Sequence, residues 1–204
     1  CYVPLAWELN ETYFSEWFIG DVVSDDALKG GQNTNDMADV YDMENWKTMS
    51  NNGLLKQYYR AQYMGIGRCN LAIQYIEQMP TDATFDLKTK QRILGEAHFL
   101  RAYYYFRMLR VFGGVPLVTK VIDSDEKWLQ KRATTDEIYT QIKTDLMTAE
   151  SYLPHKSEYT TEDLGRATKG AAQAMLLKTS LYTKDFNGAK RWGEKIIGSG
   201  EYDL

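Results

Sequence analysis

One run, residues 93–118, constrains the fold of this chain more than any other segment. Its first twenty residues carry apolar side chains on more than one stripe, at positions 93, 94, 97, 100, 103, 104, 106, 109, 111 and 112. This spacing predicts a central helix that neighbouring elements cover on several sides. Gly113-Gly114 supplies the left-handed residue that ends the helix, and Pro116 prevents its continuation. The chain must therefore leave this helix in an extended conformation.

Helix-period runs also flank the central helix. Residues 54–79 present an apolar face that ends at Pro80, and a short turn leads into the central helix over residues 87–112. Two helices joined by so short a turn predict a helical hairpin over residues 54–112. Farther on, Thr134 and Glu137 form a capping box before a helix that Pro154 ends.

The last part of the chain contains a second predicted hairpin over residues 166–199. Its first helix, residues 166–183, is rich in Gly and Ala, so that another helix can approach closely. Asp185 caps the next helix at residues 186–199. A tetratricopeptide hairpin has a similar turn and second helix, although the repeat is degenerate.

The remaining segments are less regular. Residues 5–23 carry apolar residues at mixed helical spacing, which predicts one more helix, whereas residues 29–44 are polar and turn-rich and predict a loop. Residues 119–132 and 155–165 are polar connections. No strand-rich domain is visible, so the prediction is an all-α fold with residues 1–204 as a single region.

Composition excludes several classes of function. With 204 residues, 44% hydrophobic and 25% charged, the chain can bury a substantial core. A net charge of −4 with interspersed signs offers no footprint for a phosphate backbone, so nucleic acid is not an expected partner. No apolar run approaches the roughly 20 residues that span a bilayer.

The residues that carry chemistry form no recognisable catalytic set. Asp25 and Asp26, with Asp21 upstream, diverge by about 100° on a helix, which favours hydrogen bonding at a helix end over acid–base catalysis. The triplet Asp36, Asp39 and Asp42 lacks the Gly and distal Glu of a calcium loop. The two histidines, His98 and His155, have no nucleophile motif to serve. We therefore predict no catalytic residues, no metal and no cofactor.

Aromatic residues are abundant, and most have a structural interpretation. Tyr and Phe fill the layers between helices, and four of them lie at core-like spacing: Tyr58, Tyr103, Phe106 and Tyr182. Cys69 lies in a helical pattern, where a small buried thiol is the simplest interpretation.

Trp46 stands apart from these aromatic residues, because it lies at the end of a polar loop. Tyr41, Asp42 and Asn45 precede it and Asn51 follows. An exposed indole can stack on the apolar face of a sugar while nearby amides and carboxylates bond its hydroxyls. These five residues form a candidate glycan-binding set. The alternative is that Trp46 seals the loop onto the helix at residues 54–79.

Two ordered segments resemble a known family. Residues 96–106 read Glu-Ala-His-Phe-Leu-Arg-Ala-Tyr-Tyr-Tyr-Phe, and residues 110–118 read Arg-Val-Phe-Gly-Gly-Val-Pro-Leu-Val. Residues 165–177 read Gly-Arg-Ala-Thr-Lys-Gly-Ala-Ala-Gln-Ala-Met-Leu-Leu. Together they resemble the SusD/RagB family of surface glycan-binding lipoproteins of Gram-negative bacteria.

The resemblance implies tetratricopeptide-type hairpins and a surface-exposed protein of the cell outer membrane. It also implies capture of oligosaccharide or polysaccharide, without hydrolysis, for a SusC-like TonB-dependent transporter. Family members are usually more than twice this long, so the chain is expected to be an N-terminal portion, truncated on the C-terminal side. In the family, the region around Trp46 contributes to the surface that faces the ligand.

The family is anchored through a lipidated cysteine, and Cys1 is one candidate for it. Tyr2 and the residues after it look like structured protein instead of a polar tether, so a missing N-terminal stretch is the alternative.

Two other functions stay open from the sequence. A tetratricopeptide adaptor would need a groove lined with Lys, Arg and Asn, and an α-helical glycosidase would need a separated acid and base pair.

Overall fold

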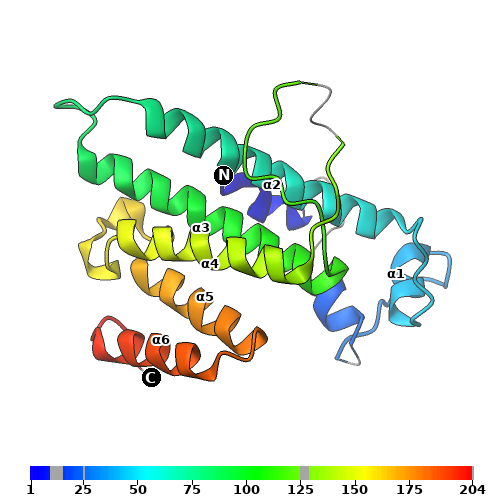
Figure 1. Ribbon diagram of the computed structural model, residues 1–204. Helices are drawn as coiled ribbons and strands as arrows, with labels where there is room; N and C mark the ends of the chain where they lie inside the picture. Colours follow the sequence, from blue (N-terminus) through cyan, green and yellow to red (C-terminus); the bar gives the residue numbers. More distant parts are fainter. Residues whose placement is uncertain (10–15, 25, 125–128, 204) are drawn as a thin grey trace. The chain divides into compact units, whose positions relative to one another are not determined.

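A computed structural model describes residues 1–9, 16–24, 26–124 and 129–203 of the chain (Figure 1). Within these ranges the regular structure is helical, and the β-type pairing consists of an isolated bridge between Pro116 and Arg132. The all-α prediction is therefore confirmed. The chain divides into two units: an N-terminal unit, Tyr2–Gly65, and a main unit, Ile66–Leu204 together with Cys1.

The N-terminal unit contains short elements around a small core. A 3₁₀ helix, η1, covers Val3–Leu9, a π-helix, η2, covers Phe18–Val22, and α1 covers Ala38–Glu44. Helix α2, Gly53–Gln78, begins in this unit. The buried core residues are Val22, Val40, Met43 and Leu54.

The helix predicted over residues 5–23 is described in part: residues 5–9 lie in the 3₁₀ helix η1, residues 18–22 form the π-helix η2, and residues 10–15 lie outside the described residues. The loop predicted over residues 29–44 was wrong at its end, because α1 occupies it. Only Val40 and Met43 of α1 are buried, and two apolar positions are too few to give a readable period. Met37, the residue before α1, has a left-handed conformation with φ 54°. The sequence does not predict this conformation, because few non-glycine residues adopt it.

The main unit is a series of packed helices. Helix α3, Leu87–Phe112, contacts α4, Thr135–Tyr152; α4 contacts α5, Lys169–Tyr182; and α5 contacts α6, Phe186–Gly198. Figure 1 shows these four helices side by side, with consecutive helices running in opposite directions. Two short 3₁₀ helices, η4 at Lys156–Glu158 and η5 at Thr161–Asp163, lie in the connection from α4 to α5.

The central helix is confirmed over its whole predicted length. Tyr104, Tyr105 and Phe106 are almost completely buried at successive positions, which requires neighbours on several sides. Tyr182, also predicted to be in the core, is 49% exposed, and its ring makes an edge-to-face contact with Phe106 at 5.1 Å. It lies near the end of α5, where helix packing covers one side only.

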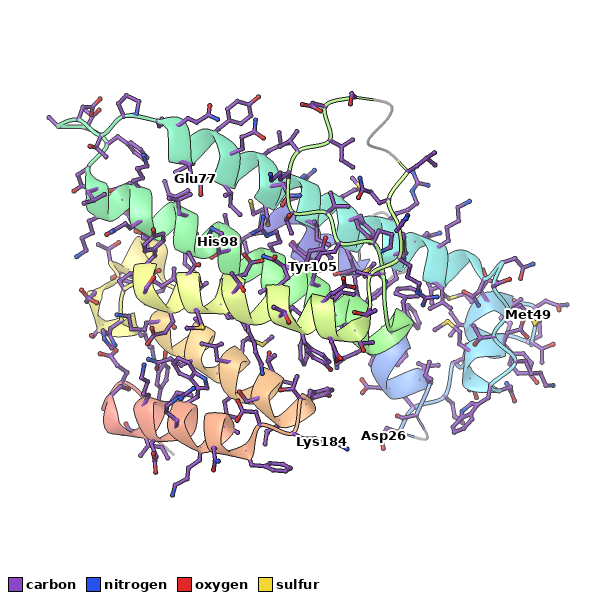
Figure 2. The ribbon with its side chains drawn as sticks, viewed as in Figure 1. Asp26, Met49, Glu77, His98, Tyr105 and Lys184 are labelled. Atoms are coloured by element: carbon purple, nitrogen blue, oxygen red, sulfur yellow. The ribbon has the colours of Figure 1, made fainter. Side chains whose placement is uncertain are left out.

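The predicted helix boundaries have clear local causes. The Thr134 hydroxyl accepts a hydrogen bond from the Glu137 backbone N–H at 3.2 Å, and the Glu137 carboxylate accepts one from the Thr134 N–H at 2.7 Å. This capping box starts α4 as predicted. Asp185 caps α6 through the Gly188 N–H, and Lys184, with φ 58°, makes the turn before it (Figure 2). Gly113 has the expected positive φ, 66°, although its ψ of −133° lies outside the left-handed helical region.

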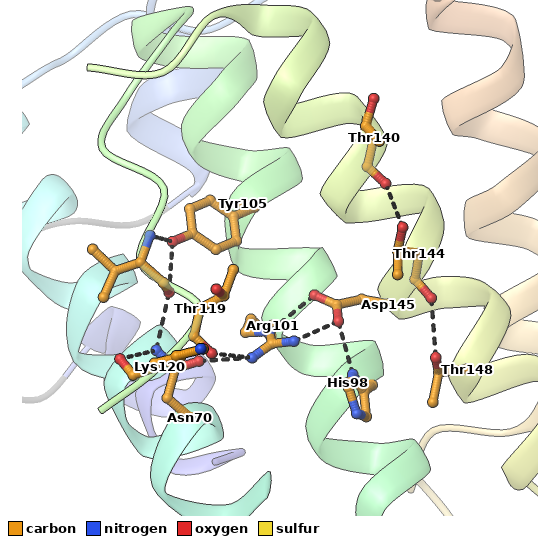
Figure 3. A network of polar contacts seen from close by, with 11 residues as sticks. Asn70, His98, Arg101, Tyr105, Thr119, Lys120, Thr140, Thr144, Asp145 and Thr148 are labelled. Carbon is orange, nitrogen blue, oxygen red and sulfur yellow. Dashed lines mark hydrogen bonds and ion pairs between the residues drawn. The ribbon is translucent and has the colours of Figure 1, made fainter. Parts of the chain in front are cut away.

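A buried polar network joins three helices to the segment that follows α3 (Figure 3). Arg101 of α3 donates to both carboxylate oxygens of Asp145 on α4, at 2.6 and 2.9 Å, and His98 Nδ1 bonds to the same carboxylate at 2.7 Å. Arg101 also donates to Asn70 of α2 and to the Thr119 carbonyl. Because Arg101 and Asp145 are both almost completely buried, these contacts satisfy charges that would otherwise be costly.

The same network fixes the extended exit from the central helix. Asn70 donates to the carbonyls of Val118 and Lys120, at 3.0 and 3.2 Å. The Tyr105 hydroxyl accepts from the Val118 N–H at 2.7 Å and donates to the Val118 carbonyl at 3.0 Å. The extended exit was predicted, whereas the network that holds it was not.

Candidate functional site

The α1–α2 loop, residues 45–52, contains the exposed indole singled out in the sequence. Helix α1 ends at Asn45, whose side-chain amide donates to the Tyr41 carbonyl at 2.8 Å. Trp46 follows with φ 59°, a left-handed conformation that few non-glycine residues adopt. The Lys47 N–H then bonds to the Asp42 carbonyl at 2.8 Å. These hydrogen bonds turn the chain sharply at Trp46.

The indole of Trp46 is 78% exposed, and Met49 in the same loop is 67% exposed. A side chain that sealed the loop onto a helix would be covered. The sealing interpretation is therefore wrong, and the indole face is accessible to a ligand.

The base of the loop is fixed by a pair of polar residues. The Asp39 carboxylate accepts from the Gly53 N–H at 2.9 Å, and the buried Asn52 side chain donates to the Asp39 carbonyl at 2.9 Å. The side-chain oxygen of Asn52, Oδ1, in turn accepts from the Leu55 N–H at 3.1 Å, in the first turn of α2. These contacts link α1 to the start of α2, so the loop between them has a defined base. Asp39 and Asn52 were not predicted in this role.

The five candidate residues lie in one continuous segment. Tyr41 and Asp42 are half-buried in the last turns of α1, whereas Asn45, Trp46 and Asn51 are exposed. The segment thus carries one exposed indole, a half-buried tyrosine, amide donors and acceptors, and one half-buried carboxylate. This donor set suits a polyhydroxylated ligand with an apolar face.

The acidic clusters have structural surroundings. Asp39 supports the loop, and the Asp36 carboxylate accepts from the Gln32 N–H in a turn. Asp26 is exposed, and its neighbour Asp25 lies outside the described residues. Within the described ranges, no group of three or more His, Cys, Asp or Glu side chains is placed to hold a metal ion.

The two cysteines differ in their surroundings. Burial raises the pKa of Cys69 to about 12, which makes it an unreactive core thiol as predicted. Cys1 is partly buried, and its carbonyl accepts from the Tyr104 hydroxyl of α3 at 2.8 Å. Of the helices that the structure describes, none combines the length and apolar character needed to cross a bilayer.

Comparison with known proteins identifies the family. Residues 8–181 match the SusD-like family model described as "Starch-binding associating with outer membrane". SusD-like protein P38 of Formosa agariphila is 31% identical over 144 residues, which cover 70% of this chain and 26% of that protein. The family is carbohydrate-binding and non-catalytic, and it is associated with the outer membrane.

Solved structures agree in fold. Surface glycan-binding protein A from Bacteroides uniformis superposes with a TM-score of 0.85 at 25% identity, over 100% of this chain and 45% of that one. A laminarin-binding SusD-like protein superposes with a TM-score of 0.80 at 29% identity, over 89% of this chain and 38% of that one. The chain thus spans less than half the length of these relatives. The family model, the relatives and the fold together show that this chain belongs to the SusD-like, or SusD/RagB, family.

Proposed function

We propose that the protein binds glycan at the bacterial cell surface, without hydrolysing it, and delivers oligosaccharide to a SusC-like TonB-dependent transporter. Family membership supports carbohydrate binding, and the names of its relatives include a laminarin-binding protein and a surface glycan-binding protein. The exposed indole of Trp46, on a loop with a fixed base, is the single observation that carries the proposal to a particular site.

In this proposal, the indole stacks on the apolar face of one sugar ring. Asn45 and Asn51 supply amide groups for its hydroxyls, and Tyr41 and Asp42 flank the site from α1. Stacking needs a rigid aromatic platform, because an ordered side chain loses little entropy on binding. The hydrogen bonds from Gly53 and Asn52 to Asp39 support such a platform.

Attachment to the outer membrane through a lipid anchor belongs to the same proposal, with Cys1 as its candidate. Nothing specifically favours the adaptor or the glycosidase. An adaptor needs a basic peptide groove, and a glycosidase needs two carboxyl groups about 5–10 Å apart around a cleft. The Asp36 carboxylate instead accepts a hydrogen bond within a turn, and the Asp39 carboxylate supports the base of the loop.

The test is the binding of glucan oligosaccharides by the Trp46→Ala variant. We expect the affinity for a laminarin or starch oligosaccharide that the parent binds to fall about 10-fold or more, as measured by calorimetry. The reason is that stacking of a ring on an aromatic side chain contributes roughly 1–3 kcal/mol. Trp46→Tyr should retain part of the affinity. Met49→Ala, which removes another exposed apolar side chain of the same loop, is the matched control and should bind like the parent. Equal affinities for the parent and Trp46→Ala would remove Trp46 from the site.

A further inference from the structure

A groove of about 410 Å³ opens in the main unit between α5, α6 and the connection that precedes α5. Its floor is made of small or aliphatic side chains at Gly170, Ala171, Ala174 and Ile196. The hollow exists because residues of α5 that face it have almost no side chain. The volume of the groove lies in the range of small-molecule sites, and such sites are also lined mainly by apolar side chains.

Tyr202 forms a fixed wall of the groove. Its hydroxyl is hydrogen-bonded to Thr168 Oγ1 at 3.0 Å, and its ring lies so close to Gly170 that a Cβ there would come within 2.5 Å of it. Only glycine at position 170 permits this ring position. The wall is therefore pre-formed, with a phenol oxygen and a threonine hydroxyl at its edge.

The charges around the groove are unevenly balanced. Arg166 is paired with Asp163 at 2.6 Å and with Glu96 at 3.2 Å, so its charge is already neutralised. Lys156 lies over the Tyr202 ring, with Nζ 5.7 Å from the ring centroid.

Lys156 carries the second positive charge described at the groove, after that of Arg166. In the part of the chain that the structure describes, no carboxylate lies within ion-pair distance of its ammonium. The nearby Glu201 carboxylate attracts it from beyond ion-pair distance and keeps its own negative charge; two hydrogen bonds from Ser157, at 2.7 and 2.9 Å, hold that carboxylate in place. An ammonium group at the rim of an apolar groove favours a ligand that brings a negative charge.

We propose that this groove is a second carbohydrate site, which takes an acidic sugar residue such as a uronic acid. The apolar ring face would lie on Ala171, Ala174 and Ile196, its carboxylate would pair with Lys156, and its hydroxyls would bond with Tyr202 and Thr168. This inference rests on the proposed glycan-binding function and extends it to a charged class of glycan. A plain aliphatic ligand would leave the rim groups unused, and a neutral sugar would leave Lys156 unused.

The experiment compares trigalacturonate with neutral maltotriose by calorimetry on purified Trp46→Ala protein, in which the proposed glucan site is removed. We expect measurable binding of trigalacturonate and weaker binding of maltotriose. Ala174→Leu fills the groove from an exposed helical position that tolerates leucine, and it should abolish trigalacturonate binding. Lys156→Gln should weaken that binding about two- to fivefold, because an exposed ion pair contributes little.

Two matched controls isolate the groove. Ala83→Leu adds the same side chain on an exposed loop, and Lys190→Gln removes an exposed lysine of α6; both should bind trigalacturonate like the parent. Trp46→Ala should also retain trigalacturonate binding.

The outcomes separate the two proposals. The groove proposal is overturned if trigalacturonate binds Ala174→Leu as well as it binds the parent, or if it binds neither protein. In either case, a loss of glucan binding in Trp46→Ala means that the proposed function still stands. If no carbohydrate of either kind binds the parent, both fail.

Discussion

At the scale of single residues, the buried charges of the main unit show how a helical protein holds an irregular segment. Burial alone would raise the pKa of Asp145, yet hydrogen bonds from His98 and Arg101 and the charge of Arg101 hold it below its ordinary value. The carboxylate therefore stays ionised in the core. Its partner Arg101 reaches Asn70 and the Thr119 carbonyl, so one ion pair positions the exit segment.

Replacement of Asp145 by Asn should destabilise the protein by about 3–5 kcal/mol, because it leaves the buried Arg101 guanidinium without a counter-charge. Urea unfolding followed by circular dichroism measures the change. Asp136→Asn alters an exposed carboxylate of the same helix and should cost about 1 kcal/mol or less. If the two variants unfold at the same urea concentration, the network does not have the stabilising role described.

At the scale of elements, the central helix accounts for the core of the main unit. Tyr104, Phe106 and Leu109 are between 1% and 6% exposed, whereas Leu87 in the first turn of the same helix is 60% exposed. Replacement of Tyr104, Phe106 or Leu109 by Ala should lower the free energy of unfolding by about 2–5 kcal/mol, because buried apolar surface is lost and a cavity remains. Leu87→Ala is the control and should shift the unfolding midpoint little. Negligible shifts for all three buried residues would contradict the central position of α3.

Two helical glycines should respond to alanine with opposite signs. At Gly95 of α3, a Cβ would lie 2.9 Å from Leu153 Cγ and 3.1 Å from Tyr152 Cβ, so Gly95→Ala should destabilise by forcing α3 away from the end of α4. At Gly67 of α2 nothing lies within 4 Å, so Gly67→Ala should stabilise by about 0.5–1 kcal/mol through helix propensity alone. Thermal unfolding of both variants gives the signs. A stabilised Gly95→Ala would mean that the two helices are not packed this closely.

At the scale of the whole molecule, the sequence could predict the long elements, because their causes are local. Residues 87–112 have a helical period, a stop at Gly113 and a cap at Asp86, and Thr134 with Glu137 marks the start of α4 without reference to other parts of the chain. Helix α1 escaped prediction because its burial depends on Val22 and Leu54, which are distant in sequence.

The site was predictable only as a set of residue types. The polar loop around Trp46 is visible in the sequence, but the exposure of the indole depends on its left-handed backbone and on the contacts of Asp39 with Asn52 and Gly53. The bonds among His98, Arg101 and Asp145 were equally invisible, because 44 and 47 residues separate their partners in sequence. Tertiary pairing of polar residues has no periodic signal comparable with that of an apolar face.

The proposed function requires that the protein bind glycan and leave it intact. The most direct measurement incubates the purified protein with laminarin and starch oligosaccharides, determines binding by calorimetry, and then assays the same samples for newly formed reducing ends. We predict saturable binding of at least one oligosaccharide, weakened in Trp46→Ala, with no increase in reducing ends for the parent or the variant. Release of reducing sugar by pure protein, or no binding of any oligosaccharide, would contradict the proposal that the protein binds glycan without hydrolysing it.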